Sequence, residues 1–354
     1  MQGGIALLFK PMLVMFGLAK RTPRPRKDHA SCSGCGLCLL VCPIWRRSRD
    51  IGMTPLGRAK ALQHGASAAD IAESIQSCTL CAACEPVCPE EIGLVAMTLD
   101  LRRQLTQPGD VQSLQARMEE QAARPLAPRP RSPVVLLPGQ ALRERPGTLA
   151  RAATLLGSAG NIPIAEDDGA DIALALEAGA AIPASRLERF LRPLRGLKKI
   201  VVADGLLLRH LRQWLPGSKI VSLGEALSGL AAVRGALRAS DLYVIEPRAY
   251  HAGYDRLVKY YDGLRQTTGC AFNLDLQRIA IPAAARSLRH TPGPEAAIEP
   301  ANNSADDSVQ ARWILQGRTV TRIVVESMED GATLREHTGL PLVHLADLAD
   351  DGTS

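Results

Sequence analysis

Eight of the nine cysteines in this chain fall into two short runs that share one spacing. In each run three cysteines are separated by two residues, and a fourth cysteine, followed directly by proline, comes after three more. The first run contains Cys32, Cys35, Cys38, Cys42 and Pro43, and the second contains Cys78, Cys81, Cys84, Cys88 and Pro89. This spacing is typical of chains that bind two [4Fe-4S] clusters. A structural zinc site usually arranges its ligands in two pairs instead.

The spacing also predicts which cysteines act together, because the fourth cysteine of each run binds the cluster of the other run. We expect Cys32, Cys35, Cys38 and Cys88 to bind one cluster, and Cys42, Cys78, Cys81 and Cys84 to bind the other. Gly34 and Gly36 allow the first loop to approach its cluster without a side-chain clash. Pro43 and Pro89 end the two loops, since proline has a fixed φ and no N–H. The chemistry of such clusters is the transfer of single electrons.

An odd number of cysteines grouped in this way does not suit a disulfide framework. Thiolates that bind iron require a reducing compartment, so the sequence predicts a cytoplasmic protein. The ninth cysteine, Cys270, begins an apolar stretch, and we expect it in the core, since a lone thiolate lacks partner ligands. The sequence has no Gly-x-Gly-x-x-Gly and no phosphate-binding Gly-Lys-Ser/Thr loop, so no nucleotide or flavin site is predicted. Asp167 and Asp168 are expected to be solvated turn residues.

The N-terminal arm combines an apolar stretch with a basic cluster. Residues 5–19 are apolar but are interrupted by Lys10 and Pro11, and they are too few to span a membrane. Basic residues follow directly, at positions 20, 21, 24, 26 and 27. An apolar helix next to basic residues favours an anionic membrane surface, so residues 5–27 predict peripheral contact with the inner face of the membrane. A helix packed on the protein or on a partner subunit, and a solvated basic tail, are the alternatives.

The composition is that of a globular protein of two or three domains. Hydrophobic residues make up 46% and charged residues 22% of the 354 residues, and the net charge is +6. Aromatic residues make up only 3%, which is too few for a surface that stacks on nucleic-acid bases. We therefore expect no nucleic-acid partner.

Changes in composition divide the chain into five segments. They are an apolar and basic arm (1–28), a helical ferredoxin-type domain with two [4Fe-4S] clusters (29–106), a proline-rich linker (107–133) and two α/β lobes (134–238 and 239–354). In the lobes, short apolar runs alternate with Leu- and Ala-rich stretches, which predicts parallel strands flanked by helices. The expected strands are 134–137, 200–202, 242–245 and 323–325. A polar segment at 291–308 is expected to be a loop.

The two lobes are predicted to be related because they repeat one order of elements. Residues 199–202, 211–213 and 219–225 parallel residues 322–325, 334–336 and 341–347, in the order strand, helix, strand.

The cysteine-rich part of the chain resembles a known family. With residues 57–62 between the runs and residues 101–103 after them, it is similar to the iron–sulfur subunits of glycolate oxidase, lactate-utilisation complexes, anaerobic glycerol-3-phosphate dehydrogenase and heterodisulfide reductase. In that family two Cys-Cys-Gly domains follow the ferredoxin module. Residues 137–139 and 243–247 resemble the segments that open each of these domains, and residues 344–348 resemble the closing segment.

The chain departs from this family after Cys88, because no Cys-Cys pair follows. Gln140 and Arg248 stand where the opening motifs would have cysteine, and residues 204–207 and 327–330 lack the later Cys-x2-Cys. The resemblance therefore implies degenerate Cys-Cys-Gly domains that have lost a third cluster site.

Together these patterns predict an electron-transfer iron–sulfur subunit. It would relay single electrons between a flavin-dependent dehydrogenase, or a similar redox subunit, and a membrane or protein acceptor. The lobes would then serve as a docking scaffold, and the chain would have no catalytic residue of its own. A heterodisulfide-reductase-like catalytic subunit and a cluster-based redox sensor or assembly factor are the alternatives.

Overall fold

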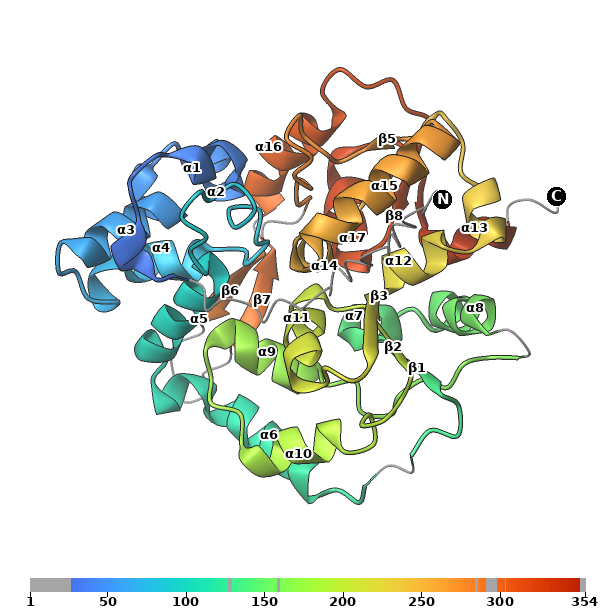
Figure 1. The fold of residues 1–354 in the computed structure, drawn as a ribbon, viewed down its shortest axis with the longest axis horizontal. Coiled ribbons are helices and arrows are strands. Elements are labelled where there is room, and N and C mark those ends of the chain that lie inside the picture. Colours follow the sequence, from blue (N-terminus) through green and yellow to red (C-terminus); the bar gives the residue numbers. More distant parts are fainter. Residues whose placement is uncertain are drawn as a thin grey trace, which may run out of the picture.

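The computed structural model describes residues 27–126, 129–157, 160–283, 286–290, 298–302 and 304–350. Apart from Lys27, the predicted N-terminal arm lies outside these residues. Figure 1 shows small helices on one side of the molecule, and two groups of strands and helices beside them. The prediction of a mixed α/β fold with parallel sheets is confirmed. Within the described ranges no helix is long and apolar enough to cross a membrane.

The N-terminal part consists of short helices around the two cysteine runs. They are η1 (His29–Ser31), α1 (Leu37–Val41), α2 (Pro43–Ser48), η2 (Ile51–Met53), α3 (Pro55–Gln63), η3 (Ala69–Ile71), α4 (Ala72–Ser77) and α5 (Leu94–Leu105). Pro43 and Pro55 begin α2 and α3, where the missing N–H of proline costs no helical hydrogen bond. Gly57 allows α3 to pack on η2, because a Cβ at this position would lie 2.1 Å from the carbonyl oxygen of Ile51.

The segment predicted as a linker differs from that expectation in its first half. Residues 107–133 contain η4 (Pro108–Val111) and the twelve-residue helix α6 (Gln112–Ala123). Leu114 and Met118 are four residues apart and lie on one face of α6, where they pack against Ala175 and Ala178. This apolar face stabilises the helix despite the prolines on either side.

The first sheet has the strand order β1-β2-β3 and is parallel throughout. Its strands are β1 (Val134–Leu137), β2 (Lys199–Val202) and β3 (Lys219–Ser222). The helices of this part are α7 (Gly139–Arg143), α8 (Pro146–Leu156), α9 (Ala170–Ala178), α10 (Ala184–Leu191), α11 (Gly205–Trp214), α12 (Leu223–Ser228) and α13 (Ala231–Gly235). The strands are almost continuously apolar because both faces of a parallel sheet are covered.

The second sheet has the strand order β5-β4-β8-β9 and is also parallel. Its strands are β4 (Asp241–Val244), β5 (Ala271–Phe272), β8 (Arg322–Val325) and β9 (Leu342–His344). The accompanying helices are α14 (Pro247–Ala252), α15 (Tyr254–Thr268), α16 (Ser304–Leu315), α17 (Met328–His337) and η5 (Leu345–Asp350). The order β4-β8-β9 thus repeats the order β1-β2-β3. The four strands that the sequence predicts are present, to within one residue at their ends.

The two sheets share one hydrophobic cluster. Leu136 and Val201 from the first sheet and Tyr243 and Val324 from the second all belong to it. Side chains alternate along a strand, so the neighbouring residues of each strand point to the opposite face of its sheet. Those of the first sheet belong to a second hydrophobic cluster, and those of the second sheet belong to a third. The two predicted lobes therefore stabilise each other through a common core.

The polar segment predicted as a loop at 291–308 contains regular structure. Strand β7 (Ile298–Asn302) pairs antiparallel with β6 (Arg286–His290), and α16 begins at Ser304. Pro300 fits into β7 because a two-stranded ribbon consists only of edge strands, on which a missing N–H is tolerated.

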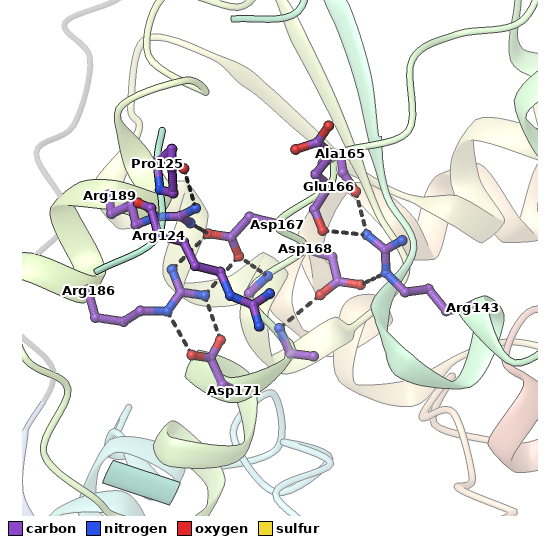
Figure 2. A network of polar contacts seen from close by, with 12 residues as sticks. Arg124, Pro125, Arg143, Ala165, Glu166, Asp167, Asp168, Asp171, Arg186 and Arg189 are labelled. Atoms are coloured by element: carbon purple, nitrogen blue, oxygen red, sulfur yellow. Dashed lines mark hydrogen bonds and ion pairs between the residues drawn. The ribbon is translucent and has the colours of Figure 1, made fainter. Parts of the chain in front are cut away.

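A buried network of ion pairs fixes the chain before α9, as Figure 2 shows. The side chain of Arg186 is 1% exposed, and it makes paired hydrogen bonds to both Asp167 and Asp171 at 2.6–2.8 Å. Arg189 also binds Asp167, and Arg143 binds Asp168. The expectation that Asp167 and Asp168 are solvated turn residues is therefore wrong. Asp167 pairs with arginines of α10, and Asp168 pairs with an arginine of α7.

Candidate metal centre

The two cysteine loops have the same backbone pattern. Gly34 and Gly36 of the first loop have φ values of 83° and 78°, and the corresponding residues of the second loop, Leu80 and Ala82, have φ values of 53° and 63°. Positive φ suits glycine but strains residues that carry a Cβ. Strained backbone of this kind often occurs at functional sites. The sequence singled out the glycines, whereas nothing in it indicated the strained conformation of the second loop.

The first group of thiols lies near the surface. Burial, together with the nearby thiols of Cys32, Cys35 and Cys88, raises the pKa of Cys38 to about 11. Cys35 is exposed. Cys88, which comes from the second run, is therefore close to three cysteines of the first run.

The second group of thiols is more deeply placed. Cys42, Cys78, Cys81 and Cys84 line one cavity. Its walls are largely apolar and include Ile44, Pro55, Leu80, Ala83, Leu94 and Val95. Burial raises the pKa of Cys42 to about 12, and the neighbouring thiols of Cys81 and Cys78 contribute to the increase. Cys42 thus belongs, by position, with the cysteines of the second run.

Positive charge surrounds Cys78. Burial alone would raise the pKa of this thiol, but Arg58 and Arg102 outweigh the effect of burial, with help from Arg248, and its pKa is lowered. A thiolate is therefore favoured at Cys78 over Cys81 and Cys84, whose pKa values burial raises.

Three buried side chains hold the backbone of the second cysteine loop. Arg102 of α5 donates to the carbonyl oxygen of Cys78 at 2.6 Å. Arg248 of α14 donates to the carbonyl oxygen of Thr79 at 3.1 and 2.8 Å. The Nδ1–H of His251, also on α14, donates to the carbonyl oxygen of Cys81 at 2.7 Å. Burial lowers the pKa of His251 to about 4, so the ring is neutral at physiological pH.

Further contacts connect this loop to the first α/β part. The guanidinium of Arg248 forms an ion pair with Glu177 of α9 at 2.8 Å, and Arg102 donates to the carbonyl oxygen of Glu177 at 2.6 Å. Glu85, which follows Cys84, forms an ion pair with Arg209 of α11 at 2.7 Å. The second cysteine loop is therefore held by helices that come from both α/β parts of the chain.

The positions where the resemblance implies lost cysteines come together in space. Gln140, Asp204, Arg248 and Ser327 line a single cavity at the carboxyl ends of β1, β2, β4 and β8. Four carboxyl side chains line the same cavity, and burial raises the pKa of two of them, that of Glu246 to about 8 and that of Glu326 to about 7. No cysteine lines this cavity.

Cys270 lies elsewhere, in the core shared by the two sheets. Its side chain is 2% exposed, and the thiol donates to the carbonyl oxygen of Arg238 at 3.2 Å. Burial raises the pKa of this thiol, so the neutral form is favoured.

The residues of the two cysteine groups suit [4Fe-4S] clusters. Each group brings four thiols together, which is the ligand set of a cubane, and the apolar walls of the second cavity would keep water from the cluster. Within the described ranges, no three His, Cys, Asp or Glu side chains are placed to hold a single metal ion. Cluster binding by the eight cysteines stays a prediction.

Sequence reasoning did not identify the side chains that position the second loop. Arg102 lies in the segment that carries the family resemblance, but Arg248 was noted only as a replacement for cysteine, and His251 not at all. Their partners are backbone carbonyl groups distant in the sequence, for which a single sequence contains no pattern.

A comparison with protein families agrees with the cysteine spacing. The model of a family described as "4Fe-4S dicluster domain" matches residues 28–92. No curated protein and no solved structure matches the chain. In the structure the two ends of the matched segment lie side by side, because Lys27 and Ile92 form a parallel β-bridge. Residues 28–92 are therefore a 4Fe-4S dicluster domain of the ferredoxin type.

Proposed function

We propose that this chain is an electron-transfer subunit with two [4Fe-4S] clusters. It relays single electrons from a flavin-dependent dehydrogenase, or a similar redox subunit, to a membrane or protein acceptor. The dicluster domain indicates iron–sulfur electron transfer, and bound clusters would supply one-electron chemistry. The donor and the acceptor are inferred from the resemblance to iron–sulfur subunits of dehydrogenase complexes.

The observation that supports a relay most directly is the crossed arrangement of the thiols. Cys38 lies with Cys32, Cys35 and Cys88, whereas Cys42, only four residues later, lies with the cysteines of the second run. Two clusters held in this way would be joined by the short helix α1. One group is near the surface and the other is buried against the rest of the protein, which suits passage of electrons between a partner and the interior.

We further propose that the α/β parts act as a scaffold. They hold the second cysteine loop through Arg248, His251 and Arg209. A heterodisulfide-type catalyst is a second candidate, because the positions of the lost cysteines still surround one cavity. It is less favoured, since Gln140, Asp204, Arg248 and Ser327 provide no thiolate for a third cluster.

The test is anaerobic purification of the full chain together with the subunits that bind to it. We expect about eight irons and eight sulfides per chain and two interacting low-potential centres after reduction, together with a copurifying flavoprotein that reduces them. Iron near half of that amount, or zinc in its place, would refute the two-cluster proposal. Reduction of a disulfide substrate by the isolated chain would favour the catalytic alternative.

A further inference from the structure

Arg58 of α3 lies in the wall of the second cysteine cavity. It is only 1% exposed, and it lines this cavity together with the four cysteines of the second group. A guanidinium in such a buried place requires both hydrogen-bond acceptors and a compensating negative charge.

The contacts of Arg58 satisfy only part of this requirement. Its Nη1 donates to the carbonyl oxygens of Met53 and Ser74, at 3.3 and 2.7 Å, and to the hydroxyl of Ser74 at 3.2 Å. These partners are uncharged. Its Nε is buried and has no hydrogen-bond partner among the described residues. A buried N–H without an acceptor is destabilising, so the Nε–H of Arg58 is expected to have an acceptor in the working protein.

The cavity that Arg58 lines is also lined by four cysteines. Apart from the cysteines and Thr79 and Thr98, the residues around Arg58 in this cavity are apolar or proline. Arg58 shares this cavity with Cys42, Cys78, Cys81 and Cys84. The acceptors that the four cysteines offer are sulfurs, and a [4Fe-4S] cluster would add further sulfurs.

We propose that Arg58 donates its Nε–H to sulfur in the second site and, with Arg102 and Arg248, gives that site a higher reduction potential than the first. The inference rests on the proposed function, since it requires that both cysteine groups bind clusters. Reduction adds a negative charge, which positive groups and N–H donors near the sulfurs stabilise.

Within the described ranges, a lysine contacts the first cysteine loop. The Nζ of Lys60 donates to the carbonyl oxygen of Cys32 at 2.9 Å. Cys35 is exposed, so water screens this site more than the buried one. Electrons that enter near Cys35 would therefore collect on the side of the domain that faces α5 and α14.

Redox titration of the reconstituted full-length protein, followed by EPR, tests the charge effect. Arg58→Gln should shift the midpoint potential of the second centre to a more negative value and leave the first unchanged. Lys60→Gln is the matched control, since it is in the same helix but contacts the other cysteine loop, and it should shift only the first centre. Unchanged potentials in Arg58→Gln with full iron content would overturn the proposal.

A second measurement starts from the unmodified protein, so detection of the coupling does not depend on how a variant folds. In protein labelled with ¹⁵N-arginine, hyperfine spectroscopy of the reduced second centre should detect an arginine nitrogen. This coupling should disappear in Arg58→Lys, which keeps the charge. Absence of the coupling with full iron content would overturn this inference alone. Iron for fewer than two clusters would instead overturn the proposed function.

Discussion

At the scale of single residues, serine substitutions of two buried cysteines are expected to have opposite effects on cluster content. Cys42 is 7% exposed and lies among the thiols of the second group, whereas Cys270 is 2% exposed and lies in the core shared by the two sheets. Cys42→Ser should disturb the centre of Cys78, Cys81 and Cys84, although the first run is nearer in sequence. We expect EPR to show loss of the second signal with the first retained, because the crossed ligand is missing.

Cys270→Ser is the matched control for that substitution. The hydroxyl can still donate to the carbonyl oxygen of Arg238, so we expect a stability loss of about 1 kcal/mol and unchanged iron content. Loss of iron in Cys270→Ser with stability retained would show that this thiol is a ligand. Loss of the first signal in Cys42→Ser would show that the ligands are not crossed.

At the scale of elements, the sequence predicts what depends on local pattern. Strands such as β1 and β8 are short apolar runs bounded by polar or turn residues, and these were found. Helix α6 was missed because its two apolar anchors, Leu114 and Met118, are few and the surrounding prolines indicate a linker. Strand β7 was missed because it contains Pro300 and lies in a polar segment. Its pairing with β6 is not visible in a single sequence.

In the candidate site, too, the sequence predicts what depends on local spacing but not what depends on tertiary contacts. The spacing of the cysteines predicts the two groups of ligands, since local spacing determines which thiols a tight loop can bring together. The charged residues around the second group come from α3, α5 and α14, and their proximity arises only from the tertiary fold.

The connection between α14 and the second cysteine loop can be tested by Arg248→Met. This substitution removes the guanidinium that pairs with the buried carboxylate of Glu177, and it removes the donors from the carbonyl oxygen of Thr79. Breaking a buried ion pair from one side costs about 3–5 kcal/mol, so we expect a large decrease in the free energy of unfolding and release of iron mainly from the second centre. Denaturant unfolding and EPR of the same preparation measure the two effects.

Arg195→Met is the control for this substitution. Arg195 forms a pair with Glu188 in which both side chains are 53% exposed, and solvent screening makes such pairs weak. It should change neither stability nor iron content measurably. If Arg248→Met behaved in the same way, α14 would not be an anchor of the loop. If Arg248→Met with Glu177→Leu recovered stability but not the second centre, the contact with Thr79 would be the one that the cluster requires.

At the scale of the whole molecule, electron transfer requires that the dicluster domain come close to its partners. The chain places its exposed thiol, Cys35, on the dicluster domain, while the second group faces the α/β parts. The sequence preceding this domain is apolar and then basic, which predicts that it contacts an anionic membrane surface. Such contact would bring the dicluster domain close to a membrane acceptor.

Deletion of residues 1–26 tests this prediction, and the structure determines where the deletion must stop. Lys27 pairs with Ile92, its carbonyl oxygen accepts a hydrogen bond from Gly93 at 3.1 Å, and its ammonium lies 3.3 Å from the carboxylate of Glu90. Removing Lys27 would therefore damage the domain itself. The deletion should leave iron content unchanged but abolish flotation with anionic vesicles, because the apolar stretch and the basic cluster each contribute only modestly and are both needed.

A full-length variant with Lys20, Arg21, Arg24 and Arg26 replaced by Gln separates these two contributions. It should bind vesicles weakly and lose the salt dependence of binding, since the charges that attract anionic lipid are gone. If the unmodified chain failed to float with anionic vesicles at low salt, membrane contact through residues 5–27 would be refuted. The arm would then be expected to bind a partner subunit, and the same deletion should release the flavoprotein from the copurified complex.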